Sequence, residues 1–93
     1  MIKSFGDKNT EKLYITGKSK KFPQTIIKTA LRKLDYLNAA KNINDLRIPP
    51  SNRLELLKGK YENVYSIRIN KQYRIIFSFH DSNAINVEVV DYH

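Results

Sequence analysis

From Arg53 onward, apolar and polar side chains alternate in short runs, and this two-residue period restricts the fold more than any other feature of the sequence. Alternation places one set of side chains on each face of a strand, so the runs predict strands over 53–57, 64–69, 73–79 and 84–90. The connections between the runs are three to six residues long. Because such short connections join neighbouring strands, we expect an antiparallel meander.

The first half of the chain has a different period. Apolar residues recur there at spacings of three and four, which predicts a helix that begins near Pro23 and buries one face. The residues of this stripe are Ile26, Ile27, Ala30, Leu31, Leu34 and Leu37. The opposite, solvated side is expected to carry the charged residues Lys28, Arg32, Lys33 and Asp35.

A shorter helix is expected before it, capped by Asn9 or Thr10 and ended by Gly17. Residues 2–5 (IKSF) alternate and predict a short opening strand. The sequence therefore predicts an α+β fold: an N-terminal strand, two helices and the antiparallel meander, with the helices on one face of the sheet and the other face free. Ninety-three residues suit one domain, 1–93.

The chain is strongly basic, with 17 Lys and Arg against nine Asp and Glu and a net charge of +8. This excess predicts a polyanionic partner, either nucleic acid or an acidic protein. Cysteine is absent, which excludes disulfides and Cys-based zinc sites, and two histidines are too few for a convincing metal site. No metal or cofactor is expected. The sequence lacks a signal-peptide pattern and an apolar run near the ~20 residues of a membrane span, so we expect a cytoplasmic protein.

The segment SIRINKQYRI, residues 66–75, contains an unusual pair of arginines. If residues 70–72 form the turn, Arg68 faces Arg74 across the hairpin, on the face away from the helices. Like charges directly opposite each other destabilise a sheet, but two guanidinium groups become favourable when a phosphate lies between them. The alternative is an exposed pair without function, tolerated because water screens it.

Further basic and aromatic residues are expected near this hairpin. Lys58 and Lys60 flank Gly59 before it, and Lys71 lies at its tip. Tyr61 and Tyr92 are free to stack on a base. Candidate nucleic-acid-binding residues are therefore Arg68, Lys60, Lys71 and Tyr61.

The sequence ends in Asp91, Tyr92 and His93. A histidine can accept or donate a proton at neutral pH, a tyrosine hydroxyl can donate one, and an aspartate can orient either group. In a straight strand Tyr92 points away from the other two, so all three meet one ligand only if the strand ends after Val90. His80, in contrast, is explained by its place in a turn.

Several segments, in order along nearly the whole chain, resemble the HigB (plasmid maintenance killer) branch of the RelE/ParE toxins. They are MIKSF, RKLDYLNAA, LRIPPSNRLELLKGK, YSIRINKQYRIIFSF and VEVVDYH. The resemblance implies a type II toxin that cuts messenger RNA in the ribosomal A site. It also implies a HigA-like helix-turn-helix antitoxin, through which alone the toxin meets operator DNA.

The resemblance places the family's catalytic surface on Lys58, Arg74, Asp91, Tyr92 and His93. Some relatives carry a histidine where this chain has Glu55, so both Glu55 and His93 are candidate bases. The expected reaction is metal-independent attack of the ribose 2′-hydroxyl on the adjacent phosphorus. Two alternatives stay open: a ParE-like toxin that inhibits gyrase through protein contacts, and a basic RNA-binding module.

Overall fold

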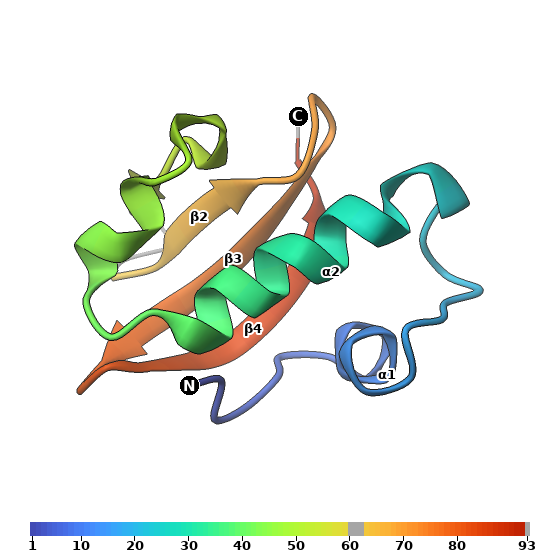
Figure 1. The fold of residues 1–93 in the computed structure, drawn as a ribbon, viewed down its shortest axis with the longest axis horizontal. Helices are drawn as coiled ribbons and strands as arrows, with labels where there is room; N and C mark the ends of the chain where they lie inside the picture. The colour runs from blue at the N-terminus through green and yellow to red at the C-terminus, as the bar shows by residue number, and fades with distance from the viewer. Residues whose placement is uncertain (60–62, 93) are drawn as a thin grey trace.

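The computed structural model describes residues 1–59 and 63–92, so the predictions for Lys60, Tyr61 and His93 lie outside the described residues. The helices are α1 (Lys8–Thr16), α2 (Gln24–Ala39) and the short 3-10 helices η1 (Ile43–Arg47) and η2 (Pro50–Asn52). The strands are β1 (Glu55–Leu56), β2 (Tyr65–Arg68), β3 (Tyr73–His80) and β4 (Asn83–Asp91). They form one antiparallel sheet in the order β1-β2-β3-β4, which confirms the predicted α+β meander (Figure 1).

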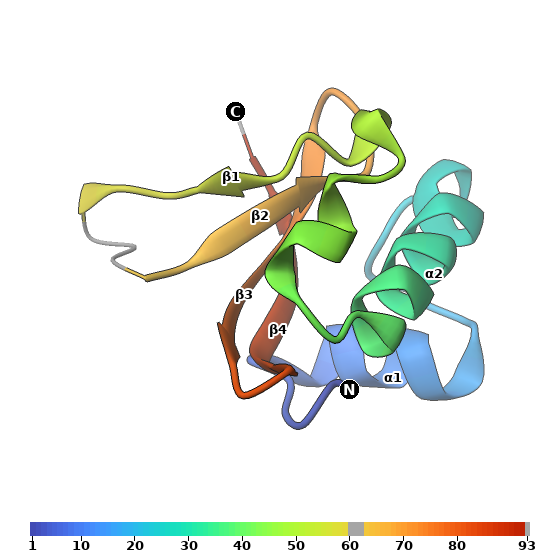
Figure 2. The same ribbon diagram turned by 60° about the vertical axis from the view of Figure 1, so that its left-hand side comes forward.

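Helices α1 and α2 pack on the same face of the sheet (Figures 1 and 2). The predicted stripe of α2 is buried apart from Leu31, which is partly buried at the edge of the core. Its partners from the strands are Ile67, Ile75, Phe77 and Val87, all at most 1% exposed. Each fully buried side chain of this size contributes roughly 1.5–3 kcal/mol, so this contact holds the sheet in place. No helix among residues 1–59 and 63–92 has the length and apolar character to cross a bilayer.

The opening segment does not form the continuous strand that alternation predicted for residues 2–5. It runs parallel to β4 and pairs with it only in two isolated bridges, Ile2 with Ala84 and Phe5 with Val87. Between the two bridges Asn86 takes a left-handed conformation, with φ 55°, and this irregularity interrupts the ladder. The Ser4 hydroxyl accepts a hydrogen bond from the Asn86 backbone N–H at 2.9 Å instead.

The first helix is capped by Asp7 rather than by Asn9 or Thr10. The Asp7 carboxylate accepts hydrogen bonds from the Thr10 backbone N–H at 2.7 Å and from the Thr10 hydroxyl at 2.9 Å. Thr10 lies inside the helix because its side chain has another partner: its Oγ accepts from the Val89 backbone N–H and so ties α1 to β4. Gly17 ends the helix with φ 74°, as predicted.

The prediction that Lys33 lies on the solvated side of α2 is wrong. Lys33 is only 2% exposed, because the segment around η2 packs against this side of the helix. Its Nζ donates to Asn52 Oδ1 at 2.6 Å and to Ser51 Oγ at 3.3 Å. Both acceptors are neutral. Burial, and in second place the nearby charge of Arg32, lower the pKa of Lys33.

The buried ammonium leads to a pH prediction. Since the pKa of Lys33 is lower in the folded state, the unfolded state binds more protons between that pKa and the ordinary value of 10.5. Folding stability therefore gains a contribution as pH rises through this window. We expect urea unfolding to show this gain in the wild type but not in Lys33→Met. Burial and Asp35 also raise the pKa of Tyr14. Because both proteins contain Tyr14, its contribution cancels in the stability difference between them. A stability difference that is constant from pH 7 to 10.5 would contradict the prediction.

Candidate active site

The β2–β3 hairpin holds Arg68 directly opposite Arg74, as the sequence predicted. The turn residue Asn70 makes this register stable, because its Oδ1 accepts hydrogen bonds from the backbone N–H groups of Gln72 at 2.8 Å and Tyr73 at 2.7 Å. A slip of one residue would move the two arginines to different faces. The local turn chemistry therefore positions the guanidinium pair.

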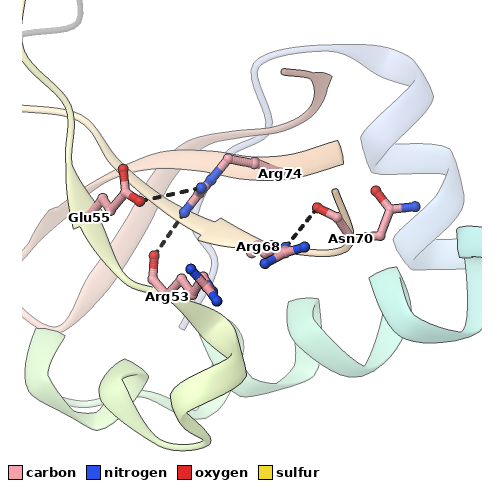
Figure 3. A network of polar contacts seen from close by, with 5 residues as sticks. All are labelled: Arg53, Glu55, Arg68, Asn70 and Arg74. Atoms are coloured by element: carbon pink, nitrogen blue, oxygen red, sulfur yellow. Dashed lines mark hydrogen bonds and ion pairs between the residues drawn. The ribbon is translucent and has the colours of Figure 1, made fainter. Parts of the chain in front are cut away.

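Arg74 lies on the sheet face opposite the helices, but this face is not free as predicted. Arg74 is only 9% exposed, because the segment that leads into β1 reaches it (Figure 3). Its Nη2 donates to the Arg53 carbonyl oxygen at 2.8 Å, and its Nη1 pairs with Glu55 Oε1 at 3.5 Å. The Tyr92 ring lies over the guanidinium, with its centroid 5.5 Å from Cζ. These contacts orient the Arg74 side chain.

The pairing of Arg74 is nevertheless incomplete. Its Nε is buried and has no hydrogen-bond partner among the described residues. The 3.5 Å separation from Glu55 is longer than the roughly 2.8 Å of a strong charge-assisted bond. Glu55 is half exposed and does not enclose the guanidinium. Arg74 can therefore form a stronger pair with an incoming anion.

A groove of about 380 Å³ opens beside this cluster, and we call it the hairpin groove. It is lined by Arg53, Glu55, Arg68, Asn70, Lys71, Arg74 and Tyr92. Four cations and one carboxylate give the lining an excess of positive charge. Arg68 is half-buried, and its Nε donates to the Asn70 carbonyl oxygen at 3.1 Å (Figure 3). A groove with this charge and with fixed guanidinium groups is suited to bind a phosphate.

The groove brings together five of the predicted residues, namely Glu55, Arg68, Lys71, Arg74 and Tyr92. Lys58 is exposed beyond the end of β1 and does not line it. Asp91 does not line it either, since β4 continues through Asp91 and pairs it with Tyr73. The Asp91 carboxylate accepts from Gln72 Nε2 at 3.0 Å.

Besides the turn residue Asn70, the sequence analysis missed one lining residue as a site residue, Arg53. It has a left-handed backbone with φ 46°, which is unusual for a residue other than glycine and costs about 1 kcal/mol. This conformation ends η2 and turns the Arg53 carbonyl toward Arg74. Its neighbourhood, Pro49-Pro50-Ser51-Asn52, signals a loop but not a left-handed residue at its end. Across residues 1–59 and 63–92, no three His, Asp or Glu side chains gather to hold a metal ion.

Solved structures with the same fold belong to a toxin and antitoxin pair. The YoeB-YefM complex from Staphylococcus aureus superposes with a TM-score of 0.61 and 19% identity, covering 100% of this chain and 98% of that one. A heterotetrameric YoeB-YefM complex from the same organism superposes with a TM-score of 0.58 and 18% identity, again covering 100% of this chain and 98% of that one. At these identities the likeness concerns the fold.

Sequence comparison identifies the family. "Toxin HigB-1" of Vibrio cholerae is 46% identical over 87 residues, which cover 92% of each chain. "Endoribonuclease HigB" of Proteus vulgaris is 30% identical over 93 residues and 100% of each chain. The family model described as RelE-like toxin of type II toxin-antitoxin system HigB matches residues 3–93. The chain therefore belongs to the HigB-like family of RelE-like toxins.

Proposed function

We propose that this toxin is an endoribonuclease that inhibits translation by cutting messenger RNA in the ribosomal A site. The observation that carries the proposal is the hairpin groove, where Arg68 and Arg74 lie opposite each other beside Tyr92 and Glu55. The full-length similarity to Endoribonuclease HigB of Proteus vulgaris supports an RNA substrate. In this proposal the whole chain, 1–93, acts as one toxin domain.

The scissile phosphate binds between Arg68 and Arg74, whose guanidinium groups neutralise the charge that develops on the phosphorane. A base removes the proton of the ribose 2′-hydroxyl, and the 2′-oxygen attacks the phosphorus. The bond from phosphorus to the 5′-oxygen breaks, and this oxygen takes a proton. The products are a 2′,3′-cyclic phosphate and a free 5′-hydroxyl, so the reaction needs no external water in this step.

Glu55 or His93 serves as the base in this scheme, and Tyr92 donates the proton to the leaving oxygen. Glu55 is favoured by its place in the groove, where its carboxylate is half exposed and is oriented by Arg74. Lys58 adds positive charge from the exposed end of β1. Asp91 supports the carboxy-terminal residues through its hydrogen bond with Gln72. Outside the described residues, Lys60 and Tyr61 bind flanking RNA, together with Lys71 at the turn.

The partner that restrains the toxin is a protein antitoxin, as the type II family implies. We propose a HigA-like antitoxin with a helix-turn-helix fold, through which alone the complex binds operator DNA. The substrate places the active toxin in the cytoplasm, where ribosomes present messenger RNA. A single groove of this size holds few nucleotides, so the ribosome supplies the alignment of the message.

The role of the Tyr92 hydroxyl is tested by Tyr92→Phe. This change keeps the ring over Arg74 but removes the proton donor, so message cleavage should fall by about 10²-fold. Binding of a 2′-O-methylated RNA, which lacks the attacking hydroxyl, should stay within twofold of wild type. Cleavage rates on programmed ribosomes and binding titrations provide the two measurements. Undiminished cleavage by Tyr92→Phe would remove the hydroxyl from the mechanism.

The proposed function is tested by adding the purified toxin to translating ribosomes and mapping the ends of the message. New 5′-hydroxyl ends inside the reading frame are the expected result. Intact message together with impaired DNA supercoiling would instead identify a gyrase-inhibiting toxin. Intact message with no effect on supercoiling, but with retained RNA binding, would identify a binding module.

A further inference from the structure

A second groove lies on the other side of Arg53 and Arg68, toward α2. It has a volume of about 400 Å³, and we call it the helix groove. Its lining consists of Thr29, Arg32, Lys33, Ser51, Arg53, Arg68, Ile69 and Asn70. Arg53, Arg68 and Asn70 also line the hairpin groove, so the two grooves share a wall. Figure 3 shows these three residues together beside the hairpin.

The helix groove is more strongly cationic than the hairpin groove. Its lining contains Arg32, Lys33, Arg53 and Arg68, and no carboxylate. In the hairpin groove, by comparison, Glu55 offsets part of the charge. The other polar residues of the helix groove carry hydroxyl or amide groups that can donate hydrogen bonds to an anion. This combination of guanidinium, ammonium and hydroxyl donors matches the oxygens of a phosphate.

The buried ammonium of Lys33 is the second observation that points to an anion. An ammonium group has three N–H donors. Among the described residues, two acceptors receive hydrogen bonds from Lys33, and both are neutral side chains, Ser51 and Asn52. The Tyr36 ring, with its centroid 6.0 Å from Nζ, supplies a weak cation–π contact but no counter-charge. A charge buried without a counter-charge is costly, and a phosphate oxygen in the groove would supply a third acceptor and the missing negative charge.

We propose that the helix groove binds the backbone phosphate that neighbours the scissile phosphate in the same RNA strand. The proposal rests on the proposed function for the identity of its ligand. A phosphate on each side of Arg68 requires a ligand that repeats its anionic group over a short distance, and an RNA backbone does so. The helix groove thus binds the strand in register, while Arg74 and Tyr92 in the hairpin groove act on the scissile phosphate.

Two matched variants on α2 test the proposal. Arg32 and Lys28 are both exposed and both carry one positive charge, but only Arg32 lines the helix groove. Arg32→Gln and Lys28→Gln therefore remove the same net charge from the same helix, and glutamine is a good helix former. The probes are a 2′-O-methylated dinucleotide with one internal phosphate and a 2′-O-methylated trinucleotide with two. Neither probe can be cleaved, so binding is measured without catalysis.

The wild type should bind the trinucleotide about tenfold more tightly than the dinucleotide in an NMR titration at low salt, as expected for one added charge-assisted contact. Arg32→Gln should lose most of this gain, so that its affinities for the two probes differ little. Lys28→Gln should behave like the wild type. The salt dependence adds a second readout, because each phosphate of a single strand contributes about −0.7 to the log-log slope. That contribution should disappear only in Arg32→Gln.

Three results would overturn the proposal. The first is an undiminished trinucleotide gain in Arg32→Gln, and the second is an equal loss in both variants, which would indicate diffuse attraction. The third is an Arg32→Gln variant with normal RNA binding but weakened binding to vacant ribosomes or to the purified antitoxin. Failure of the proposed function looks different: ribosomes would yield uncut message while the trinucleotide gain still depended on Arg32.

Discussion

Replacing Arg74 with alanine should lower the rate of message cleavage by about 10² to 10³, the loss typical of one preorganised donor that stabilises a transition state. The guanidinium is positioned before the substrate arrives, by the Arg53 carbonyl, by Glu55 and by the Tyr92 ring. No reorganisation is therefore needed when charge develops on the phosphorane. Single-turnover cleavage on ribosomes programmed with a defined message measures the effect.

Arg74→Lys separates charge from geometry. Lysine keeps the positive charge but lacks the planar fork that pairs with two oxygens at once, so we expect it to recover only part of the lost rate. Arg47→Ala serves as the matched control, because Arg47 is exposed on η1 and lines neither the hairpin groove nor the helix groove. Circular dichroism and urea midpoints establish that each variant is folded. A folded Arg74→Ala protein with wild-type cleavage would refute the phosphate-binding role.

Replacing Asn52 with alanine should lower the free energy of unfolding by about 3 kcal/mol, because the change leaves a buried ammonium without its shortest hydrogen bond. Asn52 is fully buried, and its Oδ1 accepts from Lys33 Nζ at 2.6 Å. Its Nδ2 donates to the carbonyl oxygens of Leu46 at 3.1 Å and Ile48 at 3.5 Å. One side chain thus joins α2 to both 3-10 helices. Urea unfolding at pH 7 measures the loss.

A double-mutant cycle with Lys33→Met identifies the cause. In a Lys33→Met background, Asn52→Ala no longer leaves a buried ammonium without its hydrogen bond. The free energy of unfolding of the double variant should therefore be higher, by about 1 kcal/mol or more, than the sum of the two single effects implies. Asn44→Ala is the control, since Asn44 is exposed and its side chain bonds only to Arg47 among the described residues, while its backbone N–H, which alanine keeps, donates to Asn42. Its effect should stay within about 0.5 kcal/mol. Strict additivity in the cycle would show that the Lys33 to Asn52 contact is not the source of the loss.

Sequence patterns that span only a few residues were sufficient to predict three features of the fold. These are the meander, the buried stripe of α2 and the hairpin that places Arg68 opposite Arg74. These features follow from alternation, helical spacing and the chemistry of a short turn, all of which involve neighbours in the chain. The order of several motifs along the chain was also sufficient to identify the family.

Contacts between distant segments account for what local patterns missed. Lys33 is buried because Ser51 and Asn52, 18 and 19 positions further along, pack against α2. Arg53 joins the groove because its backbone turns toward Arg74, 21 positions away. Asp91 stays out of the groove because β4 pairs it with Tyr73. The period of hydropathy in the sequence shows which face of a helix or strand is apolar, but not which loop packs against the opposite face. Both grooves are formed where the segment of Ser51 and Arg53 packs beside the β2–β3 hairpin.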